Sequence, residues 1–133
     1  MLELSKAVRD EMVAHCRAEY PKEACGILGG RSGRAAQVYT MTNLDASPIS
    51  YAMDPKEQLR VMRRLRAAGQ DMVAIYHSHT ASDAYPSPVD ASLAVYSEAS
   101  YVLVSLKTVS EPRVASYRIE DGRITEEPLV VSG

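Results

Sequence analysis

One run of residues constrains the fold of this chain more than any other. Residues 72–76 are apolar, and His77, Ser78 and His79 follow them directly. A short apolar run of this kind is typical of a buried β-strand. Because side chains two residues apart on a strand point to the same face of the sheet, both imidazoles should reach one ion. The run therefore predicts a buried strand that ends in two metal ligands.

A third ligand is expected shortly after the histidines. Asp90 supplies a carboxylate oxygen of the kind found in catalytic zinc sites, where three protein groups bind the ion and water takes the fourth position. His77, His79 and Asp90 therefore predict a zinc site with one open position, which suits hydrolysis, although cobalt or iron would also accept these ligands. Asp83 is a competing oxygen ligand, ranked lower because nothing in its loop directs it inward.

Hydrolysis at such a site needs a base that is not itself a ligand. Glu23 is the best candidate because a strand that begins there could pair beside the histidines, although a Glu at a strand entrance is more often solvated. Ser87 is either the N-cap of a helix that begins at Pro88 or a donor to the oxyanion. Asp90 is either the third ligand or the carboxylate of a capping box. We expect these two roles of Asp90 to exclude each other, and the histidines favour ligation.

The rest of the chain alternates helices and strands without a strict βαβ order. Helices are expected at residues 5–19, 54–68 and 88–97, strands at residues 24–30, 37–42, 101–106, 113–119 and near Ile124 or Leu129, and an exposed loop at residues 43–51. The second helix should carry Leu59, Met62 and Leu65 inward and a solvated face of arginines outward. The pattern predicts a mixed β-sheet flanked by helices, in a single domain over residues 1–133.

Charge and composition exclude several classes of protein. The net charge of −2 comes without a basic stripe, so a nucleic-acid interface is not expected. No apolar run approaches the roughly 20 residues that cross a bilayer, and no export signal is evident, so we expect no membrane association and a cytoplasmic location. Cys16 and Cys25 should then be reduced. Cys25 either packs as a buried thiol, which we favour, or lines the substrate cleft.

The site residues occur in a known order. Glu23, then His77 and His79, then Ser87 and Asp90 with seven and two residues between, resemble the JAMM motif of the JAB1/MPN metalloproteases. The resemblance implies an α+β JAB1/MPN fold related in architecture to cytidine deaminases. It also implies one zinc ion held by the two histidines and Asp90, with Glu23 as general base and acid and Ser87 steadying the tetrahedral intermediate.

Within this family the chain is most similar to the small Mec-type enzymes of actinobacteria, for example in residues 23–26, 76–81 and 101–105 and in Thr80, where many members have proline. Those enzymes release cysteine from the C-terminal glycine of a ubiquitin-like sulfur-carrier protein, for cysteine biosynthesis. The resemblance thus implies a carrier with a C-terminal diglycine as partner, and it leaves a homodimer open. Two alternatives remain: a JAMM peptidase acting on other ubiquitin-like or peptide tails, and a non-catalytic MPN scaffold, which the complete motif disfavours.

Overall fold

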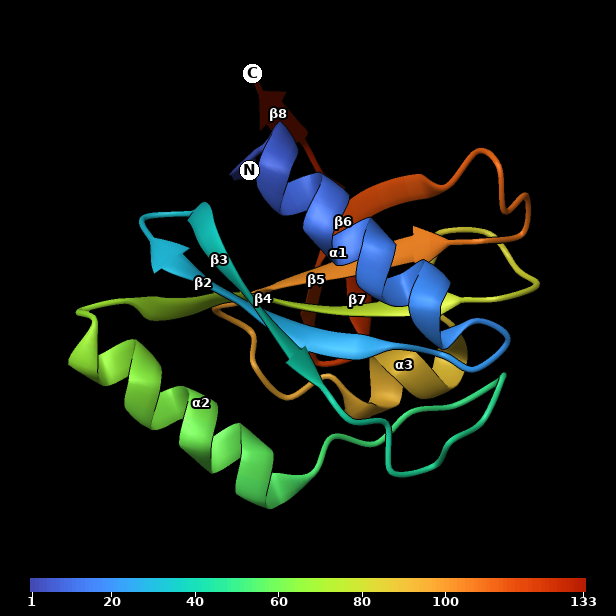
Figure 1. Cartoon of the computed structure of the whole chain (residues 1–133), viewed down its shortest axis with the longest axis horizontal. Coiled ribbons are helices and arrows are strands. Elements are labelled where there is room, and N and C mark those ends of the chain that lie inside the picture. The colour runs from blue at the N-terminus through green and yellow to red at the C-terminus, as the bar shows by residue number, and fades with distance from the viewer.

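Eight strands and three helices make up the protein, in a computed structural model that describes residues 1–133 (Figure 1). The strands are β1 (Leu2–Ser5), β2 (Cys25–Arg31), β3 (Arg34–Met41), β4 (Asp71–His79), β5 (Ser100–Ser105), β6 (Arg113–Glu120), β7 (Arg123–Glu127) and β8 (Leu129–Ser132). The helices are α1 (Lys6–Glu19), α2 (Pro55–Ala67) and α3 (Pro88–Leu93). None of them is both long and apolar enough to cross a membrane.

All eight strands join one mixed sheet in the order β7-β6-β5-β4-β2-β3-β1-β8. The strand that carries the histidines, β4, lies near the middle, antiparallel to β2 and parallel to β5. The two edge strands, β7 and β8, are separated in sequence only by Pro128, which cannot continue a ladder because it lacks an N–H. The sheet is therefore strongly curved, so that its two edge strands come close enough to be connected by a single residue.

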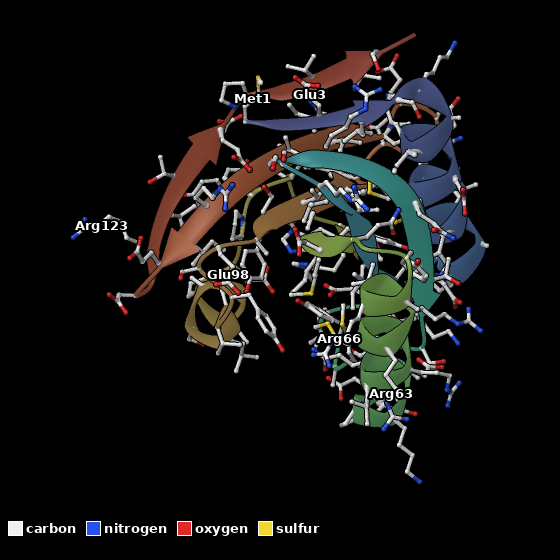
Figure 2. The ribbon with its side chains drawn as sticks, turned by 90° about the vertical axis from the view of Figure 1, so that its left-hand side faces the viewer. Met1, Glu3, Arg63, Arg66, Glu98 and Arg123 are labelled. Atoms are coloured by element: carbon white, nitrogen blue, oxygen red, sulfur yellow. The ribbon has the colours of Figure 1, made fainter.

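The helices cover opposite faces of this curved sheet. Val8, Met12 and Cys16 of α1 pack on one face against alternate residues of the central strands, among them Tyr76. Val61 and Leu65 of α2 and Ala91 of α3 belong to two smaller apolar clusters on the other face (Figure 2). Burying each large apolar side chain contributes about 1.5–3 kcal/mol. Since Ile75 belongs to the cluster under α3, the alternation along β4 places His77 and His79 on the side of α2 and α3.

Most of the expected elements are present, and three details differ. The strand β1 was not anticipated, because its four residues are defined by distant pairing with β3 and β8. Both candidates for the last strand form, as β7 and β8. The last helix, α3, ends at Leu93, four residues earlier than expected.

Of the three residues expected on the inward face of α2, Met62 and Leu65 lie there and Leu59 does not. Leu59 is 53% exposed, while Val61 is buried in its place. The helix begins at the expected N-cap, where Asp54 accepts from the N–H of Lys56, but the partly buried Gln58 turns inward and donates to the hydroxyl of Tyr96. With 3.6 residues per turn, this phase turns Leu59 toward solvent. The arginine face is solvent-exposed as predicted, with Arg63 and Arg66 on the outer side of the helix (Figure 2).

Candidate metal centre

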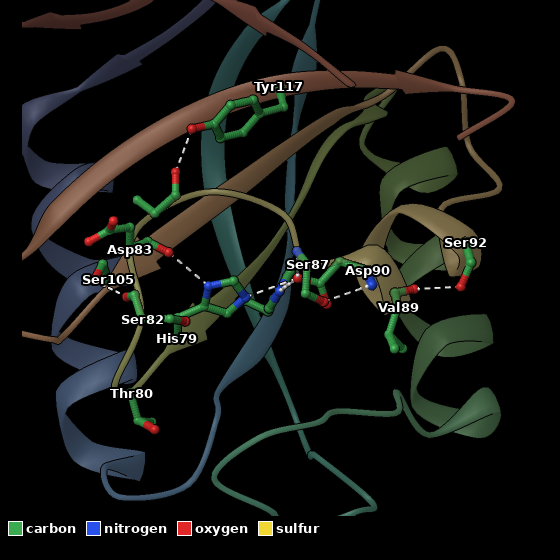
Figure 3. Close-up of polar contacts among 12 residues, drawn as sticks. His79, Thr80, Ser82, Asp83, Ser87, Val89, Asp90, Ser92, Ser105 and Tyr117 are labelled. Atoms are coloured by element: carbon green, nitrogen blue, oxygen red, sulfur yellow. Dashed lines mark hydrogen bonds and ion pairs between the residues drawn. The ribbon is translucent and has the colours of Figure 1, made fainter. Parts of the chain in front are cut away.

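Three potential ligands meet where β4 ends and α3 begins. Nε2 of His77 lies 3.1 Å and Nε2 of His79 lies 2.9 Å from Oδ2 of Asp90. The ligand atoms all lie within 4.8 Å of one another, which is close enough for one ion. Figure 3 shows two of these residues, His79 and Asp90, facing each other. The structure therefore brings together the two histidines and the carboxylate that the sequence analysis selected.

The surroundings of His77 fit a metal ion. Its side chain is 2% exposed, and neither ring nitrogen has a hydrogen-bond partner, because the contact with Asp90 lies outside hydrogen-bonding geometry. A buried polar atom without a partner costs about 1–3 kcal/mol, so a ligand bond from Nε2 would remove a real penalty. Burial also lowers the pKa of His77, which keeps the ring in the neutral form that binds metals.

His79 is oriented by the main chain of its own loop. Its Nδ1 lies 2.9 Å from the carbonyl oxygen of Asp83. Because a carbonyl can only accept, Nδ1 carries the hydrogen, and Nε2 is the atom left to face Asp90 and an ion. Burial pulls the pKa of His79 down, but the hydrogen bonds to Asp90 and Asp83 outweigh it and raise the pKa overall. The side chain of Asp83 is 83% exposed and pairs with Lys107 at 3.3 Å, so its carboxylate lies outside the cluster, in line with its lower rank.

Asp90 completes a capping box while the same carboxylate stays turned toward both histidines, so the cap does not take it out of a ligand's position as was expected. Its N–H donates to Oγ of Ser87 at 3.0 Å, and its Oδ2 accepts from the N–H of Ser87 at 2.8 Å, which completes a capping box. The same Oδ2 faces both histidines, because α3 begins directly beside the end of β4. Burial would raise the pKa of Asp90, but the two nearby histidines and the N–H of Ser87 lower it strongly, so the group is a carboxylate.

Glu23 is buried rather than solvated. It is 5% exposed, and its Oε1 has no hydrogen-bond partner. Pairing of Cys25 with His77 in the antiparallel β2–β4 ladder places Glu23, two residues earlier, across from His79. Burial raises the pKa of Glu23 to about 7, while His79 lowers it and Asp90 raises it further. A carboxyl group that titrates near neutrality can both take up and release a proton at physiological pH.

One residue of the site was missed by the sequence analysis. Tyr51, placed at the end of an exposed loop, stacks on His77 with ring centroids 4.4 Å apart and planes at 26°. Burial raises the pKa of this phenol, so it stays protonated. The only signal in the sequence was an aromatic residue at the end of a polar stretch. This signal does not show which residue the aromatic ring contacts. Cys25 packs as a fully buried free thiol, and Cys16 is also free, as predicted.

Comparisons with known proteins agree with this geometry. A family model described as prokaryotic homologs of the JAB domain matches residues 5–120. The chain is 48% identical over 122 residues to the CysO-cysteine peptidase of Mycobacterium tuberculosis H37Rv, covering 90% of this chain and 84% of that protein. It is 32% identical over 111 residues to a desampylase of Haloferax volcanii, covering 78% and 80%.

A solved structure has nearly the same fold. The solution structure of protein DSY2949 from Desulfitobacterium hafniense superposes with a TM-score of 0.90 at 39% identity, covering 99% of this chain and 93% of that one. The similarity thus extends over all the strands and helices described above, including those that carry the histidines, Asp90 and Glu23.

Proposed function

Because this chain belongs to the family of prokaryotic homologs of the JAB domain, we propose that it cleaves cysteine from the C-terminal glycine of a ubiquitin-like sulfur-carrier protein. The chain is a hydrolase that acts on a peptide bond, as the peptidase relatives indicate. The observation that carries the proposal is the convergence of two histidines, one carboxylate and a buried Glu23 at one end of β4. The 48% identity to a CysO-cysteine peptidase supports the choice of substrate.

His77, His79 and Asp90 would hold one zinc ion, within a catalytic domain that we assign to residues 1–133. Zinc bound there would lower the pKa of water to about 7 and polarise the carbonyl of the scissile bond. Glu23 takes the proton of the attacking water and passes it to the leaving nitrogen, for which a pKa of about 7 is suited. The two metal-facing rings need no further adjustment, because Tyr51 and the carbonyl of Asp83 already hold them.

Ser87 stabilises the developing oxyanion in this scheme. Its Oγ accepts from the N–H of Asp90, so the hydroxyl is held in place while its own proton stays available for donation. A preorganised donor of this kind contributes about 100- to 1000-fold in turnover.

The partner would present a flexible tail that ends in diglycine and carries the cysteine. Two exposed apolar side chains on the segments that carry site residues are available to such a partner: Ile49, 85% exposed in the loop that carries Tyr51, and Val89, 62% exposed. Val89 directly precedes Asp90, at the start of α3 (Figure 3). Glycine suits the positions next to the scissile bond because it lets the backbone approach a buried centre closely.

The test follows the mass of the substrate. A sulfur-carrier protein with a C-terminal cysteine is incubated with the purified chain, with and without a chelator, and its intact mass is measured. We expect loss of one cysteine residue, abolished by the chelator and by Glu23→Gln and restored by zinc in the wild type. An unchanged mass with zinc bound would reject this substrate. Native mass spectrometry of the same samples distinguishes a monomer from the homodimer that the family resemblance leaves open.

A second substrate class is favoured by a specific observation, the 32% identity to a desampylase. The same assay with the carrier joined through its C-terminal glycine to a lysine side chain tests this alternative. Faster cleavage of the lysine conjugate than of the cysteine adduct would favour isopeptide hydrolysis. A non-catalytic scaffold would cleave neither substrate.

A further inference from the structure

The side chain of Asn43 connects the general-base segment with the segment that packs on His77. Its Nδ2 donates to the carbonyl of Glu23 at 3.0 Å and to the carbonyl of Ser50 at 2.9 Å. Its Oδ1 accepts from the N–H of Asp45 at 3.0 Å and from the N–H of Ala52 at 3.1 Å. An amide side chain has two donor hydrogens and two acceptor lone pairs, so every one of them is used.

Two of these bonds bracket Tyr51. The carbonyl of Ser50 and the N–H of Ala52, one residue before and one after it, are both held by Asn43. Tyr51 in turn stacks on His77. The amide thus fixes the backbone on both sides of the aromatic ring that supports a ligand, while its remaining donor hydrogen holds the backbone of Glu23.

The loop formed by residues 43–53 is also attached at other points around the site. The N–H of Glu23 donates to the carbonyl of Ser47 at 2.8 Å. The hydroxyl of Thr80, the residue after His79, donates to the carbonyl of Pro48 at 2.9 Å. Asn43 and Met53 form a bridge that closes the base of the loop. The loop is therefore a brace between the start of β2 and the end of β4, and Asn43 lies at its base.

We propose that Asn43 is a positioning residue that holds Glu23 and, through Tyr51, His77 in the arrangement needed for hydrolysis. The inference rests on the proposed function, because it assigns Asn43 a role in the same reaction. Asn43 acts through its neighbours and needs no contact with the reacting atoms. Displacement of a reacting group by about 1 Å can cost on the order of 100-fold in rate, so a loosened brace should lower turnover without removing any group that takes part in the chemistry.

Two substitutions distinguish the role of the donor group of the Asn43 side chain from that of its acceptor oxygen. Asn43→Asp keeps an oxygen for the N–H groups of Asp45 and Ala52 but replaces the donors to Glu23 and Ser50 with an acceptor, whereas Asn43→Ala removes all four bonds. Ser50→Ala is the matched control in the same loop. It removes only a hydroxyl bonded to the exposed Asp45 at 3.0 Å and leaves the main chain unchanged.

Kinetics give the first measurement. We expect kcat for the carrier adduct to fall by about 10-fold or more in both Asn43 variants, with KM changed by less than about threefold and zinc still bound. Ser50→Ala should stay within about twofold of the wild type. A merely structural role would lower thermal stability and the active fraction and leave the kcat of the folded, zinc-loaded enzyme unchanged. Wild-type kcat in Asn43→Asp, or an equal loss in Ser50→Ala, would overturn the proposal.

Hydrogen exchange gives a second measurement that needs no substrate. The amide of Glu23 should exchange faster in both Asn43 variants and that of Ala52 faster in Asn43→Ala, which removes its acceptor, while the β2–β4 ladder keeps its protection. Unchanged protection at both amides would also overturn the proposal. If the wild type fails to cleave the carrier adduct, the proposed function fails, and hydrogen exchange still decides whether Asn43 holds the loop. Should Asn43→Ala not fold, Asn43→Asp, which keeps the shape of the side chain, takes its place.

Discussion

Replacing each of the two histidines by leucine should affect the stability of the metal-free protein in opposite directions. Neither nitrogen of His77 has a hydrogen-bond partner, so His77→Leu removes a burial penalty of about 1–3 kcal/mol. It also removes the stacking on Tyr51, which is worth about 0.5–1.5 kcal/mol. The balance is a gain of about 1 kcal/mol in the free energy of unfolding.

His79→Leu should do the reverse. It removes the bonds of the ring to Asp90 at 2.9 Å and to the carbonyl of Asp83 at 2.9 Å, and hydrogen bonds to charged groups contribute about 1.5–3 kcal/mol. The two variants should therefore differ by about 3 kcal/mol in the free energy of unfolding. For a domain of 133 residues this corresponds to a difference in Tm of very roughly 10 °C.

Urea and thermal unfolding in the presence of a chelator measure this difference, and zinc titration provides the second arm. An ion at about 1000 times its Kd stabilises the wild type by about 4 kcal/mol, and both variants should lose this gain. If His77→Leu destabilises the chelator-treated protein as much as His79→Leu does, the imidazole of His77 has a partner and the reasoning is refuted. A zinc-induced rise in Tm that survives in either variant would refute the assignment of the ligands.

Three further predictions concern the carboxylates and Ser87. Glu23→Gln should retain zinc by elemental analysis and lose about 100- to 10,000-fold in kcat, and turnover within a few-fold of the wild type would remove Glu23 from the mechanism. Ser87→Ala should lower kcat by about 100-fold or more and stability by about 1 kcal/mol, whereas Ser87→Thr, which keeps the hydroxyl, should preserve most of the stability. Burial tends to raise the pKa of Glu127, but Ser100, Ser116 and other partners lower it from 4.5 to about 2. Its stabilising effect should therefore be present above pH 4.5 and lost toward pH 2, so acid unfolding curves of Glu127→Gln should be flatter in this window, and identical curves would contradict it.

The parts of the fold with strong local signals were predictable from sequence. The apolar run before His77 and the N-cap at Asp54 place β4 and α2 to within a residue or two. The strand β1 and the inward face of α2 were not predictable in this way. The first depends on pairing with β8, more than 100 residues away, and the second on a shift of helical phase that the hydrophobic pattern alone does not resolve.

The candidate site also has features that local sequence predicts and features that depend on tertiary packing. Spacing within one strand was enough to predict that His77 and His79 face one ion, and the geometry agrees. The burial of Glu23 and the stacking of Tyr51 depend on how the loop of residues 43–53 folds back over the site. Turn-forming residues indicate that a loop is present, but the partners of its side chains are set by tertiary packing, as the four bonds of Asn43 illustrate.

Asp90 shows how one carboxylate can satisfy two requirements that were expected to be incompatible, a helix cap and a position facing the two histidines. A capping box and a metal ligand both need a carboxylate, and on paper they compete for its orientation. Here the N–H of Ser87 holds Oδ2 at 2.8 Å while that oxygen also faces both histidines. The cap therefore fixes the rotamer before an ion arrives, so metal binding has less side-chain entropy to overcome. The residues that start α3 would therefore also help Asp90 to bind the ion that we propose for this site.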